Sequence, residues 1–424
     1  MRDTAYFKNK KVIVVGLARS GLACANLLYD LGARVSITDC KDAELLRTNT
    51  ALLKSKDIRL ELGSHSAAIV KGNELMIISP GVENKAKPVL WAEKFGIPVI
   101  SEIEFASMLC PADIIAVTGS GGKSTVTTLI GKIIEASGKK AYVCGNIGKP
   151  FSQYLQAMNA GDIVSLEVSS FQLERIVKFR PKIALILNFA KNHLDRHKDM
   201  QEYLDAKKRI FMNQGEDDYL ILNSGDSVVS SLAKEARSKI VFFFGNAELN
   251  PNQAAVMAVG AILGINKDLI LKVFKEFKGI EHRLEFVAEL NGIKFINDSK
   301  ATLAESTIWA LESINGGVVL ICGGRHKGVD YSVIKKVAEK KIRKVIVIGE
   351  AAQLIEDALT PSFVVEHAIS LAEAVDKAFH SAKRGDYVLL SPMCSSFDMF
   401  NNYEDRGRVF KKLVMEKAKT KVRA

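Results

Sequence analysis

One strand, one turn and one helix in succession constrain this chain more than any other feature. Residues 114–118 are apolar and β-prone, residues 119–122 read Gly-Ser-Gly-Gly, and a helical pattern begins near Lys123. Glycines let backbone N–H groups converge on an anion at a helix N-terminus, the lysine adds a positive charge, and the hydroxyl of Ser124 or Thr125 can hold Mg²⁺. The stretch therefore predicts a site for the phosphates of ATP or GTP.

The spacing of this loop differs from that of the common nucleotide-binding loop. The common pattern has a glycine six residues before the lysine, but Val117 occupies that place and the first glycine is Gly119. The loop is therefore a shorter variant, TGxxGKS. A glycine-rich turn between a strand and a helix can also be purely structural, and the lysine and serine that follow favour the phosphate site.

Length and composition describe a globular chain with more than one domain. At 424 residues, with roughly 100–200 residues per domain, two to four domains are expected. No apolar run is long enough to span a membrane and the N-terminus lacks the apolar segment of a signal peptide, so we expect a cytoplasmic protein. The six cysteines form no CxxC pair, which favours buried reduced thiols over disulfides or a zinc site.

The net charge of +11 leaves several partners open. Much of the excess lies between Arg406 and Ala424, where eight Lys and Arg residues accompany a single Glu416. We interpret this segment as the solvated face of a helix. Since no basic stripe with interleaved aromatic residues and no nucleic-acid motif is present, the charge favours small anionic metabolites over nucleic acid.

Strands alternate with helical patterns along the whole chain, which predicts an α/β fold with mainly parallel sheets. We expect three domains: a Rossmann-like domain over residues 1–105, a central P-loop-type ATPase domain over residues 106–282, and a Rossmann-like C-terminal domain over residues 283–424. The strands that define them are expected within residues 11–15, 35–39, 76–82, 96–100, 114–118, 163–168, 183–188, 219–223, 294–298, 318–324, 345–349 and 387–391.

The first glycine turn, residues 16–21, is a near miss to the dinucleotide fingerprint. The GxGxxG pattern fails at Ala18, although Asp39 lies about where a ribose-binding acid would be. NAD is therefore a weak prediction. The same geometry offers helix N-terminal N–H groups, beside Ser20, to any diphosphate.

Three further acidic or basic residues follow strands of the central region. Glu167 ends an apolar strand, where a carboxylate points toward the ligand crevice of an open α/β sheet and could bind Mg²⁺ with Ser124. An exposed strand-end carboxylate is the alternative. His193 and Asp195 follow another strand, and from the residues alone His193 is as consistent with a structural role as with a catalytic one.

Taken together, these motifs resemble the Mur ligases. The resemblance covers nearly the whole chain in order. It is carried by the phosphate loop and by residues 145–148 (GNIG), 166–173 (LEVSSFQL), 188–195 (NFAKNHLD), 203–211, 281–285 (EHRLE), 297–302 (NDSKAT), 323–327 (GGRHK) and 389–400. What it implies is an ATP-dependent ligase that adds D-glutamate to UDP-N-acetylmuramoyl-L-alanine through an acyl phosphate, in peptidoglycan precursor synthesis.

The resemblance also implies roles for particular residues. Three of them are implied to be catalytic: Lys123, His193 and Lys207. The implied ATP-binding residues are Gly119, Ser120, Gly121, Gly122, Lys123, Ser124, Thr125, Asn252, Arg283, Asp298 and Lys300. The implied UDP-substrate residues are Ser20, Gly81, Asn146 and Ser169, and those for D-glutamate are Thr302, Lys327, Ser396 and Tyr403. Two magnesium ions are implied at Ser124, Glu167, His193 and Lys207.

Lys207 matches the position of the family's carbamylated lysine, where CO₂ captured by the amine yields a metal-binding anion. From the residues alone, Lys207 would be a solvated helix lysine. The chain departs from the family at Gly121, Asn192 and Leu303, where Asn, Asp and Asn are usual. Glu248 and Leu249 also replace the His-Asn of the adenine-binding segment, so Asn252 alone is retained there.

Three alternatives remain. The first is a sibling amide ligase, either another Mur enzyme or a folylpolyglutamate synthase. The second is an NAD-dependent dehydrogenase built on the first domain, which Ala18 disfavours. The third is a nucleotide switch or nucleic-acid-binding protein, suggested by the positive charge. We expect a monomer with small-molecule substrates.

Overall fold

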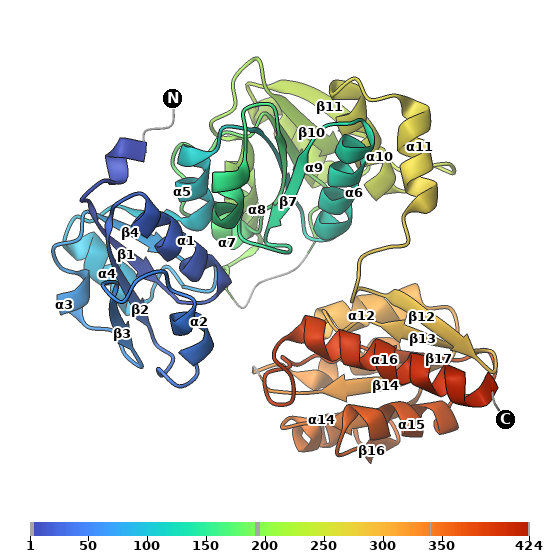
Figure 1. The fold of residues 1–424 in the computed structure, drawn as a ribbon. Helices are drawn as coiled ribbons and strands as arrows, with labels where there is room; N and C mark the ends of the chain where they lie inside the picture. The colour runs from blue at the N-terminus through green and yellow to red at the C-terminus, as the bar shows by residue number, and fades with distance from the viewer. Residues whose placement is uncertain (1–3, 191–195, 327, 340, 423–424) are drawn as a thin grey trace. The chain divides into compact units, whose positions relative to one another are not determined.

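The computed structural model describes residues 4–190, 196–326, 328–339 and 341–422, which Figure 1 traces from blue to red. The chain divides between Phe277 and Lys278 into two compact units. Three sheets, with mostly parallel strands, form within the described residues and confirm the predicted α/β class. The domain boundaries near residues 105 and 282 stay predictions.

The first sheet has the strand order β3-β2-β1-β4-β5 and is parallel throughout. Because the strand order reverses between β1 and β4, the crevice at their carboxyl ends is the expected ligand site of such a sheet. Its strands are β1 (Lys11–Val15), β2 (Arg34–Asp39), β3 (Arg59–Leu62), β4 (Leu75–Ile78) and β5 (Val99–Ser101). Its helices are η1 (Thr4–Phe7), α1 (Arg19–Asp30), α2 (Arg47–Ala51), α3 (Ala67–Val70) and α4 (Lys87–Lys94).

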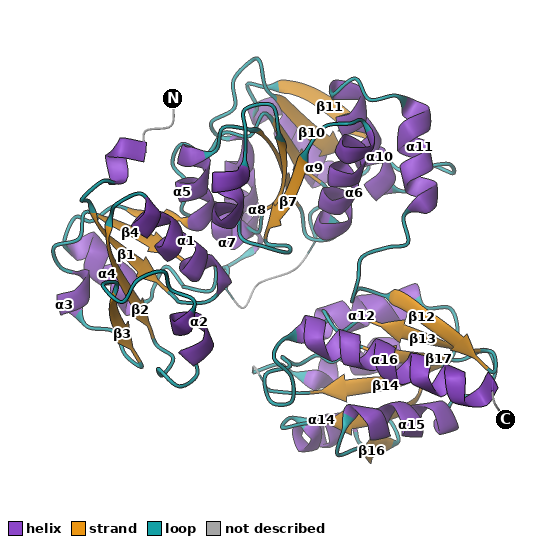
Figure 2. Cartoon of the chain, viewed as in Figure 1, coloured by secondary structure: helices purple, strands orange, loops and turns teal. Residues whose placement is uncertain are grey.

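The second sheet, also parallel, has the order β11-β10-β9-β6-β8-β7. Figure 2 labels three of its strands, β7, β10 and β11. Its strands are β6 (Asp113–Thr118), β7 (Ala141–Gly145), β8 (Ile163–Glu167), β9 (Ile183–Ile186), β10 (Tyr219–Asn223) and β11 (Lys239–Phe243). Its helices are α6 (Lys123–Ala136), η2 (Phe151–Ala157), α7 (Ser170–Leu173), α8 (Met200–Lys208), η3 (Arg209–Phe211), α9 (Ser227–Ser231), η4 (Leu232–Glu235), α10 (Pro251–Ile262) and α11 (Lys267–Glu276). The order again reverses at β6, whose carboxyl end carries the phosphate loop.

Helix α5 (Glu102–Leu109) joins these two sheets and is buried between them. One apolar cluster includes residues from both sheets together with Phe105 and Leu109 of this helix. The buried carboxylate of Glu104 accepts hydrogen bonds from the backbone N–H groups of residues 177, 178 and 179, at 2.8–2.9 Å. Because a buried carboxylate needs such donors, these contacts fix the first sheet against the second.

The third sheet belongs to the second unit and has the order β12-β13-β17-β14-β15-β16. Only the β12–β13 pair is antiparallel among its described pairings. Its strands are β12 (Glu285–Leu290), β13 (Ile293–Asn297), β14 (Val318–Gly323), β15 (Ile342–Ile348), β16 (Val365–His367) and β17 (Tyr387–Leu390). Its helices are α12 (Ala304–Ser313), η5 (Tyr331–Ile334), α13 (Lys335–Ala338), α14 (Ala352–Leu359), α15 (Leu371–Ser381) and α16 (Tyr403–Val422).

Two expectations about side-chain environment need correction. All six cysteines are free as expected, but Cys40 is exposed and Cys110 only partly buried. The basic C-terminal segment does form a helix, α16, yet its Arg406 is buried rather than solvated. No helix in the described ranges is both long and apolar enough to cross a bilayer.

Candidate active site

The phosphate loop has the backbone geometry that an anion cradle requires. Gly122 caps the N-terminus of α6 with φ of +79°, and Gly119 has φ of +150°. A Cβ on Gly122 would lie 2.4 Å from Oδ1 of Asn252, and one on Gly119 would lie 3.0 Å from Cβ of Leu187. Glycine is therefore required at both positions, and Asn252 of α10 lies directly against the loop.

Lys123 folds back over this loop. Its Nζ donates to the carbonyl oxygens of Gly119 at 2.8 Å and Ser120 at 3.3 Å. Ser124, in the first turn of α6, is buried, and Thr127 donates to the carbonyl of Lys123 at 2.8 Å. The ammonium and the helix N-terminus thus place positive charge on one side of the loop.

The side chain of Asn188 holds the outer part of the loop. Its Oδ1 accepts from the N–H of Gly121 at 2.8 Å, and its Nδ2 donates to the carbonyl of Gly121 at 3.2 Å. Asn188 follows β9, next to β6 in the sheet. The sequence indicated Asn188 only as part of a motif, not as a residue that orients the loop.

Glu167 ends β8, the neighbour of β6 on the other side. Its side chain is 2% exposed, and Oε1 accepts from Nδ2 of Asn146 at 2.8 Å. Oε2 is buried without a hydrogen-bond partner in the described chain, as is Oγ1 of Thr118 at the end of β6. Orphaned buried oxygens are costly, and hard cations prefer such ligands, so this donor set fits magnesium. The alternative of an exposed strand-end carboxylate is wrong.

Lys207 lies on α8 and is 1% exposed. Its Nζ donates to the carbonyl of Gly119 at 2.9 Å and lies 4.4 Å from the ring centroid of Tyr203. Burial, together with the charge of Lys123, lowers the pKa of Lys207 well below its usual value. No carboxylate pairs with this amine in the described part of the chain. The alternative of a solvated helix lysine is therefore wrong.

Tyr203, beside this lysine, and His197, packed against Tyr203, were not predicted as site residues. The hydroxyl of Tyr203 lies 3.3 Å from Oγ of Ser120, in the phosphate loop. His197 is buried, with Nε2 2.9 Å from Oγ of Ser170 and its ring 5.1 Å from that of Tyr203. The predicted His193, with Asn192 and Asp195, lies outside the described residues.

The predicted UDP-substrate residues follow strands or begin helices in the first unit. Ser20 lies in the first turn of α1, and exposed Gly81 follows β4, the neighbour of β1. Asn146 follows β7 and donates to Glu167, as described above. Ser169 caps α7 in a capping box with Gln172. Asp39 accepts from the N–H of Leu17 at 2.7 Å, which ties it to the first glycine turn.

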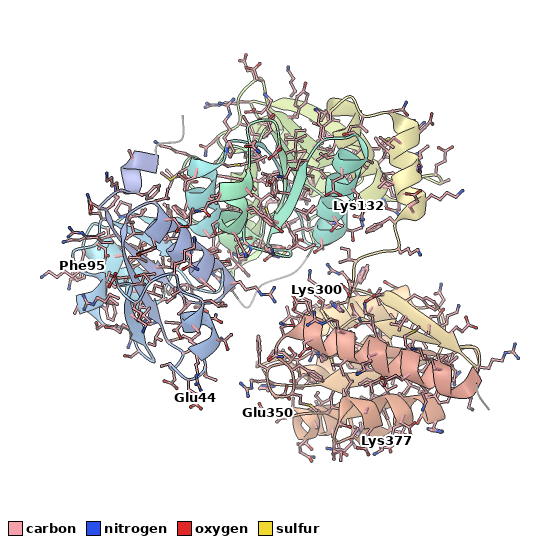
Figure 3. All side chains as sticks on the ribbon, viewed as in Figure 1. Glu44, Phe95, Lys132, Lys300, Glu350 and Lys377 are labelled. Carbon is pink, nitrogen blue, oxygen red and sulfur yellow. The ribbon has the colours of Figure 1, made fainter. Side chains whose placement is uncertain are left out.

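Residues of the second unit gather at the carboxyl ends of β13 and β17. Asp298 is buried, accepts from Oγ of Ser391 at 2.9 Å, and has its pKa raised by burial to about 7. Half-buried Arg283 acts against that rise. Lys300, labelled in Figure 3, follows β13, and its N–H donates to the carbonyl of His282 at 3.1 Å.

The predicted D-glutamate residues occupy the same unit. Thr302 is half-buried, Ser396 is buried, and Tyr403 begins α16, with its carbonyl accepting from Oγ of Ser299 at 2.8 Å. Lys327 lies outside the described residues, and Leu303 is exposed.

Arg406 was not predicted and is the largest buried side chain of this unit. It is 1% exposed, and burial lowers its pKa to about 10. The guanidinium donates to Oγ and the carbonyl of Ser299, each at 3.0 Å, and to the carbonyl of Cys394 at 3.1 Å. It therefore joins the loop after β13 to the loop after β17. No sequence pattern distinguishes it from the exposed basic residues of the same helix.

Three family profiles match the chain in order. They describe a MurD-like Mur ligase N-terminal domain (residues 10–101), a Mur ligase middle domain (117–286) and a Mur ligase glutamate ligase domain (282–394). With relatives that match over nearly the full chain, these profiles show that the chain belongs to the Mur ligase family. Members of this family are ATP-dependent ligases of peptidoglycan precursors, and the chain is such a ligase.

Curated relatives share a more specific name, UDP-N-acetylmuramoylalanine–D-glutamate ligase. The relative from Koribacter versatilis is 41% identical, over 97% of this chain and 98% of its own. The relative from Thermoanaerobacter pseudethanolicus is 40% identical, over 96% and 99%.

Solved structures share the fold at lower identity. UDP-N-acetylmuramate-alanine ligase MurC of Thermotoga maritima has a TM-score of 0.60 at 19% identity, with 96% and 99% of the two chains covered. The pseudomurein peptide ligase type C of Methanothermus fervidus has a TM-score of 0.56 at 18% identity, with 96% and 100% covered.

Proposed function

We propose that this chain joins D-glutamate to UDP-N-acetylmuramoyl-L-alanine, with ATP converted to ADP and phosphate. The observation that carries the proposal is the 41% identity, over nearly the whole of both chains, to a relative that bears this name. The site supports the chemistry, because a phosphate loop, an orphaned buried carboxylate and a buried amine meet at the carboxyl edge of the second sheet.

In the proposed reaction, the alanine carboxylate attacks the γ-phosphorus of ATP, forming an acyl phosphate and releasing ADP. The D-glutamate amine then attacks the acyl carbon, loses a proton and expels phosphate. Lys123 and the N–H groups of the loop oppose the negative charge of the transferring phosphoryl group. Such transfers depend mainly on positioning and electrostatic stabilisation.

We propose that magnesium, as two ions, binds at Ser124, Glu167, His193 and a carbamate on Lys207. The metal would supply charge neutralisation at the phosphate and carboxylate oxygens. The buried orphan oxygen of Glu167 supports this assignment.

The carbamate forms when the neutral Lys207 amine attacks the carbon of CO₂ and releases a proton. Its lowered pKa supports this step, because an ammonium has no lone pair to attack with. The resulting carbamate anion on Lys207 would be a favourable charge partner for the nearby ammonium of Lys123, which the unmodified amine is not.

We assign the remaining residues by the same family correspondence. Ser20, Gly81, Asn146 and Ser169 would bind the UDP-linked substrate. ATP would contact the loop, Asn252, Arg283, Asp298 and Lys300. Thr302, Lys327, Ser396 and Tyr403 would bind D-glutamate. We further propose domains over residues 1–105, 106–282 and 283–424, and a monomer that acts in the cytoplasm.

The test is ATP-dependent phosphate release with UDP-N-acetylmuramoyl-L-alanine and a panel of amino acids. Among these amino acids, we expect only D-glutamate to support phosphate release. Release with L-alanine or a diaminopimelate would indicate a sibling ligase, and release with folate substrates a folylpolyglutamate synthase. FolC of Escherichia coli shares the fold with a TM-score of 0.54 at 16% identity. Absence of amino-acid-dependent ATP turnover would favour a nucleotide switch or a nucleic-acid-binding protein. A change in nicotinamide fluorescence when NADH is added would favour a dehydrogenase.

A further inference from the structure

The loop that follows β4 is held by an arginine from the second sheet's part of the chain. Nη1 of Arg196 donates to the carbonyl of Pro80 at 2.9 Å, and Nη2 donates to the carbonyl of Val82 at 2.8 Å. These two carbonyls flank Gly81. One planar guanidinium therefore fixes the backbone on both sides of the exposed glycine.

Contacts on both sides hold this arrangement in place. The Arg196 guanidinium lies 4.1 Å from the ring centroid of Phe171, which restricts its plane. At the start of the loop, Oγ of Ser79 donates to the carbonyl of Gly16 at 3.1 Å. The Gly81 loop is thus tied both to the glycine turn before Ser20 and to the second sheet.

Arg196 also connects two places to which the UDP-linked substrate is assigned. That substrate is assigned to Gly81 and to Ser169, which caps α7, and Phe171 lies in that same helix.

We propose that Arg196 is a positioning residue that sets the Gly81 loop, and thereby the UDP-linked substrate, relative to helix α7 of the second sheet's part of the chain. The inference rests on the proposed function. Lysine cannot replace this side chain, because a single ammonium lacks the planar fork that reaches two carbonyls at once.

The test compares Arg196→Lys with the wild-type protein in steady-state kinetics and in calorimetry with UDP-N-acetylmuramoyl-L-alanine alone. We expect the KM and Kd for this substrate to rise at least about tenfold, the lower end of the effect of losing one charge-assisted hydrogen bond. The KM values for ATP and D-glutamate should change less than about twofold, since neither ligand is assigned to the Gly81 loop.

Arg209→Lys is the matched control. Its guanidinium also donates to two carbonyls, of Leu173 at 2.8 Å and Ile176 at 2.6 Å, but not to the Gly81 loop. It should lower Tm without the selective effect on the UDP-linked substrate. Unchanged KM values in Arg196→Lys, or an equal rise of KM for all three substrates, would overturn this inference and leave the proposed function standing. Failure of the wild-type protein to use this substrate would refute the proposed function and the inference with it.

Discussion

Burial determines what Lys207 can do. An amine removed from water and placed near a second cation favours its neutral form, which is the nucleophile that CO₂ requires. Sequence reasoning could not show this burial, because Lys207 has charged neighbours, Asp205, Lys208 and Arg209, and the segment reads as a solvated helix face. Only the packing of α8 against Gly119 reveals the difference from Lys208, whose side chain is partly exposed and paired with Asp205 and Glu235.

We predict that Lys207→Ala loses most ligase activity, because the site then lacks the anion that would hold magnesium. A small carboxylate such as formate should restore part of the activity by occupying the vacated space, and removal of CO₂ should lower wild-type activity reversibly. Turnover is measured at saturating magnesium, ATP and both substrates. Lys208→Ala is the control and should retain activity. Wild-type turnover in Lys207→Ala would refute the carbamate.

Replacing Lys123 tests the phosphate loop itself. Lys123→Ala should lower kcat about a hundredfold or more, since removal of one group that stabilises developing charge has effects of that order. Phosphate release at saturating substrates measures it. Lys132→Ala, an exposed lysine of the same helix labelled in Figure 3, should behave as wild type. Near-normal turnover in Lys123→Ala would remove the loop from the mechanism.

At the scale of elements, the boundary at the glycine-rich turn was predictable from the sequence, and two strands at sheet edges were not. The apolar run into Gly119–Gly122 predicted the boundary between β6 and α6, because glycines interrupt a buried strand and lysine begins the helix pattern. The short strand β11 (Lys239–Phe243) and the antiparallel β12 were not predicted. Both lie at sheet edges and are partly exposed. Glutamates interrupt the apolar pattern of β12, whereas β11 does contain an apolar run, residues 240–243, that was not assigned to a strand.

The close approach of the Asn252 side chain to Gly122 leads to a prediction about the phosphate loop. Gly122→Ala should raise the KM for ATP at least about tenfold, because a Cβ there meets Asn252 and the loop must shift. Gly138→Ala is the control. It has a similar φ of +84° but no atom within 4 Å of the added Cβ.

Both variants should lose about 1–2 kcal/mol of stability from the left-handed backbone conformation, measured by denaturant unfolding. Only Gly122→Ala should lose affinity for ATP. Equal ATP kinetics in the two variants would show that contact with Asn252 does not shape the phosphate site.

At the scale of the whole molecule, the alternation of strands and helices predicted the α/β class, and the order of the motifs predicted the family. Most of these motifs stand where a strand of a parallel sheet ends, although residues 203–211 lie mainly in α8 and residues 281–285 lead into β12. The buried charged side chains that connect distant segments of the chain were not predictable. Glu104 and Arg406 are ordinary charged residues in the sequence, and their burial depends on backbone groups far away along the chain.

Asp298 should make the stability of the protein depend on pH. Burial raises its pKa from 3.8 to about 7, so the folded chain binds this proton more tightly than the unfolded chain does. The resulting stabilisation is complete below about pH 4 and is lost as the pH rises to about 7, by up to about 4 kcal/mol. In Asp298→Asn this dependence is absent, and the amide can still accept from Ser391. We therefore expect the Tm of the variant, relative to wild type, to rise between pH 5 and pH 8, as measured by calorimetry of the full chain. A difference in Tm that stays constant across this range would show that Asp298 is ionised in the folded protein throughout.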